Sequence, residues 1–392
     1  RKRESIARWR ADRLQLLIDC AALCEPLNAV IQASLSGPSA HLCRGYNLAF
    51  LGVLVNATRH PDVHLVRRFV VGFPVYGQLG PVGCFAPDGP LPEVSPPEAH
   101  INRSSNRDWN ARLFASVQAA GDAARLQPDS AAWDAISQVW AKTVSECSDG
   151  WTLGVDTGAT GPDADARWRG FLPSELDSHP WFAGLGSWRG IRRHGVVQKD
   201  SVRPVDDCTE NKINPVSGSA DKVTLVRPDV AARVCACFAR ETLAWQDELH
   251  RRGVWREQRG TSRWRVLDPY LHGKDDVKKA FRRLPTDSPG LMVVVIFNPG
   301  TFRAEAFVVP GFVFGCYAAV HGWNRVPRAY SHFSRRLLAV PSVDYYDDFM
   351  IGGPVYDQPS SQSSQYALFD LVGLGFDLGK HEGGGATSVV LG

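Results

Sequence analysis

Apolar residues recur every three or four positions in four long stretches, which cover residues 1–35, 108–126, 130–147 and 227–253. This spacing is typical of amphipathic helices, because it places the apolar side chains on one face. The first stretch predicts one helix or two, with an apolar face formed by Ile6, Trp9, Leu14, Leu17, Ala21 and Cys24. The basic residues between them predict a solvated face, formed by Arg1, Lys2, Arg3, Arg8 and Arg10.

Strand patterns are strongest in the second half of the chain. Residues 291–297 are continuously apolar, which predicts a strand that is covered on both faces. Asn298-Pro299-Gly300 predicts a turn, and residues 306–309 predict the returning strand. Residues 262–267 predict a further strand, and the β-rich run over residues 68–76 predicts one in the first half of the chain.

Two polar segments divide the chain. Residues 85–104 are rich in proline and predict a loop or linker at a domain boundary. Residues 148–170 are rich in Gly and Asp and predict a loop; a calcium loop is the alternative, but no terminal bidentate acid is present. We therefore expect a mainly helical region over residues 1–84, a linker over 85–104, a region of helices and loops over 105–187, and a last part over 188–392.

Length and charge bound the class of protein only loosely. The chain has 392 residues, enough for two or three domains with a sizeable core. Its formal net charge is only +3, from 44 basic and 41 acidic residues. Overall charge thus gives no sign of nucleic-acid binding, and any basic groove has to be local. Because the chain begins at Arg1 and ends without a polar tail, we expect it to be a piece of a longer polyprotein.

Cysteine usage bears on the compartment. The chain has 9 cysteines, which are Cys20, Cys24, Cys43, Cys84, Cys147, Cys208, Cys235, Cys237 and Cys316. An odd count in a long chain argues against a disulfide framework and for a reducing compartment. A zinc site is the alternative for Cys20, Cys24, His41 and Cys43. That set lacks a short Cys-x-x-Cys pair, and buried cysteines are the favoured interpretation.

Hydropathy adds an expectation about membranes. The chain has no run of about eighteen apolar residues, the length that a membrane-spanning helix needs. We therefore expect no transmembrane helix and no membrane partner, and we see no signal peptide. The expected location is intracellular, in the cytoplasm or the nucleus.

The segment richest in chemistry is Val343–Ile351, an apolar and aromatic run with Asp347 and Asp348 at its centre. Neighbouring side chains of a strand point to opposite faces, so two adjacent acids fit a hairpin tip better than a strand interior. Acids at such a tip repel each other, and a divalent cation relieves the repulsion. The alternative is a solvated Asp-Asp turn. A third carboxylate upstream, at Asp276, favours the metal site.

Together these segments resemble the palm of reverse transcriptases, the RNA-directed DNA polymerases of retroelements. In that family an Asp-x-x-x-Ala-aromatic segment lies beside a Tyr-x-Asp-Asp hairpin. The first segment is matched by Asp276, Ala280 and Phe281, and the second by Tyr345, Asp347 and Asp348. Asp275 is an internal alternative to Asp276, but only Asp276 has the family's spacing to Ala280 and Phe281.

Further segments follow in the family's order over residues 188–392. Residues 192–207 resemble the fingers hairpin, and the positions of that region are matched by Lys199, Arg203, Asp206, Asp207 and Asn214. Residues 312–315 resemble a Leu-Pro-x-Gly turn; Gly315 matches, whereas Phe312 and Val313 replace the family's Leu and Pro. Residues 371–380 resemble the motif whose Lys, here Lys380, lies near the leaving pyrophosphate. Residues 389–392 resemble the start of the primer grip, so we expect the thumb elsewhere in the polyprotein.

The resemblance implies a fold of the α+β class. The expected architecture is a polymerase right hand with fingers and palm over residues 188–392, preceded by the mainly helical N-terminal region. The palm is expected to be a ferredoxin-like antiparallel sheet with helices on one face.

The resemblance also implies roles for individual residues. Two Mg²⁺ ions, with Mn²⁺ as an alternative, are expected on the carboxylates of Asp276, Asp347 and Asp348 and on the Val277 carbonyl. Lys380 is expected to protonate the leaving group. Nucleotide-binding roles are implied for Lys199, Arg203, Phe281, Gly315 and Tyr346, with Phe281 as a steric gate against the 2′-hydroxyl.

The implied partners are an RNA or DNA template with its primer, deoxynucleoside triphosphates, and other modules of the same polyprotein. These modules are a thumb and an RNase H or integrase/recombinase. The expected activity is template-directed DNA synthesis. Two alternatives stay open, a degenerate or domesticated copy that binds nucleic acid without catalysis, and an RNA-copying polymerase of the same palm class.

Overall fold

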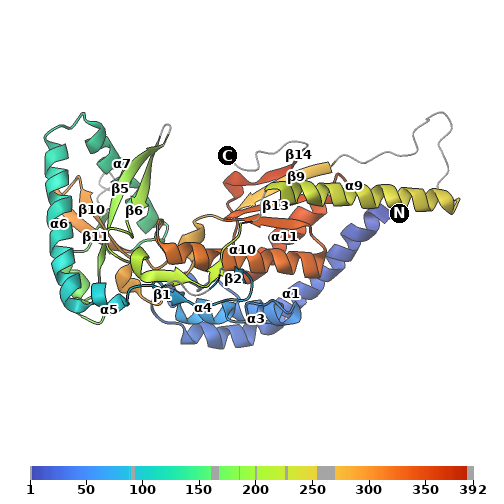
Figure 1. The fold of residues 1–392 in the computed structure, drawn as a ribbon, viewed down its shortest axis with the longest axis horizontal. Helices are drawn as coiled ribbons and strands as arrows, with labels where there is room; N and C mark the ends of the chain where they lie inside the picture. Colours follow the sequence, from blue (N-terminus) through green and yellow to red (C-terminus); the bar gives the residue numbers. More distant parts are fainter. Residues whose placement is uncertain are drawn as a thin grey trace.

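The computed structural model describes residues 2–253 and 270–385, apart from residues 88, 90–92, 160–166, 185, 199–200 and 226–227. The chain combines helices with small sheets in two lobes that lie side by side (Figure 1). Each lobe contains one four-stranded sheet. The fold is therefore mixed α and β, as expected for the α+β class.

Sheet A, in the lobe on the left of Figure 1, has the strand order β11-β10-β5-β6. Its strands are β11 (Arg303–Val308), β10 (Val293–Asn298), β5 (Gly190–Gln198) and β6 (Ser201–Asp206). β10 pairs antiparallel with β11 and parallel with β5, and β5 and β6 form an antiparallel hairpin. The hairpin predicted over residues 192–207 and the turn after residue 297 are both confirmed.

Strand β10 is buried along its whole length, as its apolar run predicts. Val294 and Ile296 belong to the larger hydrophobic core, whereas Val295 and Phe297 belong to a second core beneath helix α6 (Arg103–Arg125). Helix α7 (Ala131–Ser148) also packs on this sheet. Both helices were expected from their apolar spacing, and Ser130 caps α7 by accepting a hydrogen bond from the backbone of Trp133.

Sheet B, in the other lobe, has the strand order β12-β13-β9-β14, and all of its pairs are antiparallel. Its strands are β12 (Ser342–Tyr345), β13 (Asp348–Pro354), β9 (Tyr270–Asp276) and β14 (Glu382–Gly385). Helices α10 (Tyr317–Leu338) and α11 (Gln358–Val372) pack against it. The ring of Phe349 meets the ring of Phe369 of α11, with centroids 4.9 Å apart.

Helix α9 (Pro228–Arg251) contacts the opposite face of sheet B. The rings of Phe238 and Tyr270 lie 6.1 Å apart, and alternation along β9 places Tyr270 on the same face as Asp276. The prediction of helices on one face of this sheet is therefore wrong. The contact lies at the end of β9 opposite to Asp276, so the Asp276 end of that face stays open to the cavity described below.

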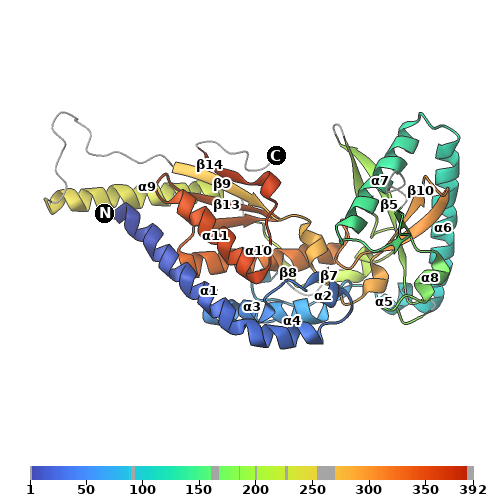
Figure 2. The same ribbon diagram turned by 180° about the vertical axis from the view of Figure 1, so that it is seen from behind.

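The N-terminal region is helical and packs against the helices of sheet B (Figure 2). Its helices are α1 (Lys2–Ser34), α2 (Gly37–Leu42), α3 (Leu48–Ala57) and α4 (Leu65–Val71). α1 is one continuous helix that contains Pro26. By length and composition alone, its segment Ser5–Ser34 is apolar enough to cross a membrane. Core helices of soluble proteins and signal sequences meet the same criterion of length and composition, so this criterion does not distinguish a membrane span from either.

Two local predictions in this region are wrong. Residues 68–76 do not form a strand, because α4 covers residues 65–71 and buries Leu65 and Phe69 on one helical face. Tertiary packing outweighs the β-forming tendency of these residues. Arg10 does not lie on a solvated face. It is 2 % exposed, its Nε donates to the Leu338 carbonyl at 2.8 Å, and its guanidinium pairs with Asp357.

Short elements occupy the two segments predicted as loops. Strand β2 (Ala86–Pro87) and helix α5 (Pro97–His100) lie within residues 85–104, and β3 (Val155–Asp156) pairs with β4 (Trp168–Arg169) within residues 148–170. The remaining short elements are β1 (Gly77–Leu79), α8 (Pro173–Asp177), β7 (Ser217–Ser219) and β8 (Asp221–Lys222). β1 pairs with β7, and β2 pairs with β8. The strand predicted over residues 262–267 lies outside the described residues.

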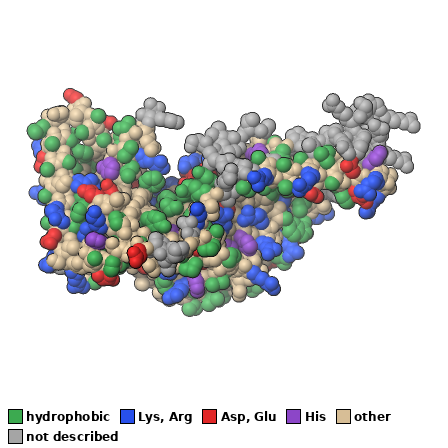
Figure 3. All heavy atoms as spheres, in the orientation of Figure 1, with side chains coloured by type: hydrophobic (Ala, Val, Ile, Leu, Met, Phe, Trp, Pro, Cys, Tyr) green, Lys and Arg blue, Asp and Glu red, His purple; other side chains and the backbone are tan. Residues whose placement is uncertain are grey.

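Charged side chains are spread over both lobes. On the face shown in Figure 3, Lys and Arg side chains are interspersed with Asp and Glu. This distribution agrees with the small net charge of +3. Electrostatic attraction of an anionic ligand therefore has to come from individual side chains around a site.

Candidate active site

The hairpin β12–β13 carries the adjacent acids at its tip, as predicted. Tyr345 pairs with Asp348 in the register, so Tyr346 and Asp347 form a two-residue turn. Tyr346 has a φ of 53°, which the first position of such a turn requires. The indole Nε1 of Trp323 in α10 donates to the Tyr346 carbonyl at 2.9 Å. The helix thereby holds the tip of the hairpin in place.

Strand β9 brings the third acid beside this tip. Asp276 lies directly opposite Asp348 in the antiparallel register, so both side chains point to the same face of sheet B. The backbone N–H of Val277 donates to the Asp347 carbonyl at 2.9 Å. Burial, and next the charge of Asp276, raise the pKa of Asp347 above its ordinary value. The structure thus brings together the three acids that the sequence analysis selects.

Two of these three acids are paired with lysines. Nζ of Lys380 lies 2.8 Å from Oδ2 of Asp276, and Nζ of Lys274 lies 3.2 Å from Oδ2 of Asp348. The hydrogen bond to Asp276 raises the pKa of Lys380. Burial raises the pKa of Asp348, while Lys274 opposes that shift. Lys380 was selected from the sequence, whereas Lys274 was not, because its side chain meets Asp348 only through the pairing of β9 with β13.

A cavity of about 360 Å³ opens beside the acids. Its lining contains Asp276, Val277, Phe281, Asp347 and Lys380, and on the opposite side Arg203 of β6. An adjoining cavity of about 510 Å³ shares Arg203, Phe281 and Asp347. The second cavity is more apolar; it shares Phe314 with the first and adds the aromatic side chains of Tyr317, Trp323 and Tyr346. Residues from both lobes therefore meet around one continuous site.

The predicted nucleotide-binding residues lie around these two cavities. The guanidinium of Arg203 lies 4.9 Å from the ring centroid of Phe314, within the range of a cation–π contact. The rings of Phe314 and Phe281 lie 6.3 Å apart. Gly315 and Tyr346 line the more apolar cavity. Lys199 lies outside the described residues.

Gly315 occupies a position that other residues fit poorly. Its φ is 102°, and a Cβ built on it would lie 2.4 Å from the Asp206 carbonyl oxygen. The side chain of Asn214 fixes this turn, because its Nδ2 donates to the Gly315 carbonyl at 2.9 Å and its Oδ1 accepts from the Tyr317 N–H at 2.7 Å. Val313, which replaces the family's Pro, is fully buried in the core rather than in the cavity.

Gly315→Ala is expected to destabilise the fold by about 1–3 kcal/mol, because a side chain with this φ is strained and the Asp206 backbone has to move. Urea unfolding measures the change. Gly80→Ala is the matched control, since a Cβ at Gly80 meets no atom within 4 Å. Equal midpoints for the two variants would contradict the prediction.

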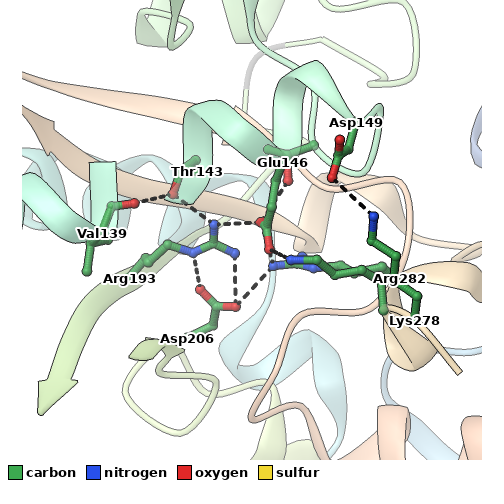
Figure 4. A network of polar contacts seen from close by, with 10 residues as sticks. Val139, Thr143, Glu146, Asp149, Arg193, Asp206, Lys278 and Arg282 are labelled. Atoms are coloured by element: carbon green, nitrogen blue, oxygen red, sulfur yellow. Dashed lines mark hydrogen bonds and ion pairs between the residues drawn. The ribbon is translucent and has the colours of Figure 1, made fainter. Parts of the chain in front are cut away.

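A buried ionic network joins the two lobes at the wall of the first cavity (Figure 4). Glu146 of α7 accepts hydrogen bonds from Arg193 of β5 at 3.2 Å, from Lys279 at 2.8 Å and from Arg282 at 3.2 Å. Lys279 directly precedes the short helix η3 (Ala280–Arg283), and Arg282 belongs to that helix, which also carries Phe281. Asp206 of β6 completes the network by accepting from Arg193 at 2.7 Å. The residues that bear Phe281 are thus tied to the hairpin that bears Arg203.

Burial shapes the charges in this network. Burial alone would raise the pKa of Glu146, but Arg282, Arg193 and Lys279 outweigh it and hold this pKa well below its ordinary range. The sequence analysis assigns no role to Glu146, Arg193 or Arg282. Each lies in a different segment of the chain, so no local spacing marks them as partners.

The carboxylates around the cavity are the candidate ligands for the expected magnesium ions. Within the part of the chain that the structure describes, no group of three or more His, Cys, Asp or Glu side chains is arranged to hold a metal ion. Asp276 and Asp347, however, line the same cavity. Mg²⁺ in proteins is commonly held by one or two carboxylates together with waters and substrate phosphates. The residues therefore fit a site that the substrate completes, provided that the Lys380 ammonium moves off Asp276.

Comparison with known proteins gives little beyond this geometry. No protein-family model matches the chain. No curated protein matches it either. Among solved structures, the chain is similar to the foamy viral protease-reverse transcriptase dRH in complex with double-stranded DNA, with 10 % identity and a TM-score of 0.33. The match covers 50 % of this chain and 27 % of that one. At this level of similarity we base the functional proposal on the site itself.

Proposed function

We propose that this chain is a template-directed DNA polymerase of the reverse transcriptase class. One observation carries the proposal: Asp276, Asp347, Phe281 and Arg203, from three separate sequence segments, converge on a single pair of connected cavities. In this proposal sheet B with its helices is the palm, and the β5–β6 hairpin belongs to the fingers.

The cavity provides what nucleotidyl transfer requires. The 3′ oxygen of the primer forms a bond to the α-phosphorus of the incoming nucleotide, and the bond from that phosphorus to the bridging oxygen breaks. The 3′-hydroxyl loses its proton to solvent, and Lys380 gives a proton to the departing pyrophosphate. Arg203 faces the acids across the cavity and pairs with the triphosphate. When bound by the acids, Mg²⁺ would supply Lewis-acid stabilisation of the phosphoryl charge.

The position of Phe281 favours deoxynucleotides. Its ring lines both cavities together with Asp347 and Phe314. A bulky ring beneath the sugar leaves no room for a 2′-hydroxyl. This is the observation that separates the proposal from an RNA-copying polymerase of the same class.

Primer extension tests the proposed function. The folded chain is given a primed RNA template, Mg²⁺ and deoxynucleotides. Extension that depends on the template sequence supports the proposal. A folded protein that binds primer–template in a filter assay but adds no nucleotide would identify it as a degenerate copy, the second candidate.

Phe281→Ala is expected to raise the use of ribonucleotides relative to deoxynucleotides by about 100-fold, because a pocket that rejects one extra group gains roughly that much from losing the obstructing ring. Competition between the two nucleotide types in primer extension measures the ratio. Phe302→Ala is the matched control, since Phe302 is partly exposed on the turn between β10 and β11 and lines neither cavity. An unchanged ratio in Phe281→Ala would remove the steric-gate assignment.

A further inference from the structure

Asp275 and Asp276 are neighbours on β9, but their side chains lie on opposite faces of sheet B. Asp276 lines the cavity, whereas the side chain of Asp275 has no exposed surface. Oδ1 of Asp275 accepts a hydrogen bond from Nε2 of Gln362 in α11 at 3.2 Å and lies 2.6 Å from Nδ1 of His381. Asp275 is therefore engaged behind the sheet and does not reach the site of the other acids.

The same alternation appears in the segment that meets these two acids. Lys380 contacts Asp276 on the cavity side, and the next residue, His381, contacts Asp275 on the other side. Lys380 and His381 thus contact the consecutive residues Asp276 and Asp275 of β9 on opposite faces of sheet B. The backbone adds one anchor upstream, where the Asp377 N–H donates to the Asp276 carbonyl at 2.7 Å.

The side chains of β14, the strand that follows His381, can add little to these contacts with β9. β14 consists of Glu382 followed by three glycines, and its register with β9 is irregular. Gln362 donates a second hydrogen bond to the Glu382 carbonyl at 3.0 Å. Besides the backbone pairing of β14 with β9, the contacts of His381 with Asp275 and of Gln362 with Glu382 help to place this segment.

We infer that Asp275 and His381 form a positioning pair that fastens the segment carrying Lys380 beside Asp276, so that the Lys380 side chain stays at the cavity whether or not its ammonium contacts that carboxylate. The inference concerns a contact within this chain; it rests on the proposed function only for the consequence, which is delivery of a proton to pyrophosphate. Asp275, an alternative ligand in the sequence, has in the structure the different task of fastening the segment that carries the proton donor.

Lysine labelling tests the pair without any polymerase assay. The chain is treated with a limiting amount of acetic anhydride, and acetylation of each lysine is followed by peptide mass spectrometry. An amino group that is hydrogen-bonded to Asp276 is less available to the reagent than a free one, so the labelling rate reports whether Lys380 keeps this contact. His381→Ala is expected to raise the labelling rate of Lys380 severalfold, with exposed Lys212 as the internal reference.

Two further variants make this result specific. His381→Asn is expected to restore slow labelling, because its side-chain amide nitrogen takes the position of Nδ1 and can still donate to Asp275. Glu382→Ala, at the exposed neighbouring side chain, is expected to label like the wild type. His381 is 42 % exposed, so its substitution leaves the core intact.

The activity measurement then places the pair in the reaction. His381→Ala is expected to lower the kcat of primer extension about tenfold with KM for the primer–template unchanged, because partial loss of a positioned proton donor affects the chemical step. Unchanged Lys380 labelling in His381→Ala overturns the inference. A third outcome separates the two claims. If Lys380 is labelled faster in His381→Ala but the wild-type chain does not extend primers, the positioning pair is supported and the proposed function is rejected.

Discussion

Asp347→Asn is expected to reduce primer extension by about a thousandfold or more, the loss that corresponds to several kcal/mol of transition-state stabilisation. Asp347 stands at the tip of the hairpin, lines both cavities and has its pKa raised by burial and by Asp276. An amide at this position keeps the shape but removes the charge that attracts a divalent cation. Single-nucleotide extension under saturating substrate measures the loss.

The control for this variant is Asp370→Asn, an exposed carboxylate on α11 that lines neither cavity. It is expected to extend primers at the wild-type rate. Binding of Mn²⁺ to the folded chain, followed by paramagnetic relaxation of water, gives a readout that needs no turnover. Asp347→Asn with full activity, or with undiminished Mn²⁺ binding, would contradict the assignment of Asp347 as a ligand.

Glu146→Gln is expected to destabilise the fold by about 3–5 kcal/mol, the usual cost of removing one partner from a buried ionic network. The side chain of Glu146 is 12 % exposed and faces Arg193, which is 1 % exposed, and Arg282, which is 9 % exposed. Without the carboxylate, two buried guanidinium groups share Asp206 alone. Urea unfolding at neutral pH measures the change, and Asp156→Asn, in an exposed pair with Arg167, is expected to show almost none.

The same network predicts a pH dependence. The pKa of Glu146 is lower in the folded chain than in the unfolded chain, so the unfolded chain takes up the proton first as the pH falls. The stabilisation from Glu146 is therefore complete above the ordinary carboxyl pKa of about 4.3 and is lost as the pH falls toward the folded value. Between about pH 5 and pH 3, the wild type should lose more stability than Glu146→Gln. Parallel pH profiles for the two proteins would refute this account.

Local patterns predict the elements whose signal lies within one continuous segment of the sequence. The apolar run of β10, the hairpin at Asp347 and the spacing of α6 and α7 are of this kind. Helix α11 escaped prediction because its buried face carries Gln358, Gln362 and Gln365, which an apolar pattern does not detect. The burial of Arg10 could not be predicted because its partners, Asp357 and the Leu338 carbonyl, lie far along the chain.

The candidate site divides in the same way. Asp276, Asp347 and Lys380 can be selected by motif spacing, and the structure brings them together. The residues that support them, such as Lys274, His381 and Glu146, become visible only when strand register and lobe packing are known. Sequence spacing thus identifies the residues proposed to act in catalysis better than it identifies their supporting partners.

The grip of Glu146 on both lobes has a mechanical consequence. Its carboxylate binds Arg193 at the base of the β5–β6 hairpin and Lys279 and Arg282 around Phe281. A hairpin that swung inward as an isolated flap would have to break these buried bonds. The motion of lowest energetic cost is a bend of β5 and β6 beyond Arg193, because the base of the hairpin then keeps its buried bonds. Such a bend would move Arg203 relative to the rest of the cavity. Phe281 and the acids of sheet B would keep their mutual distance.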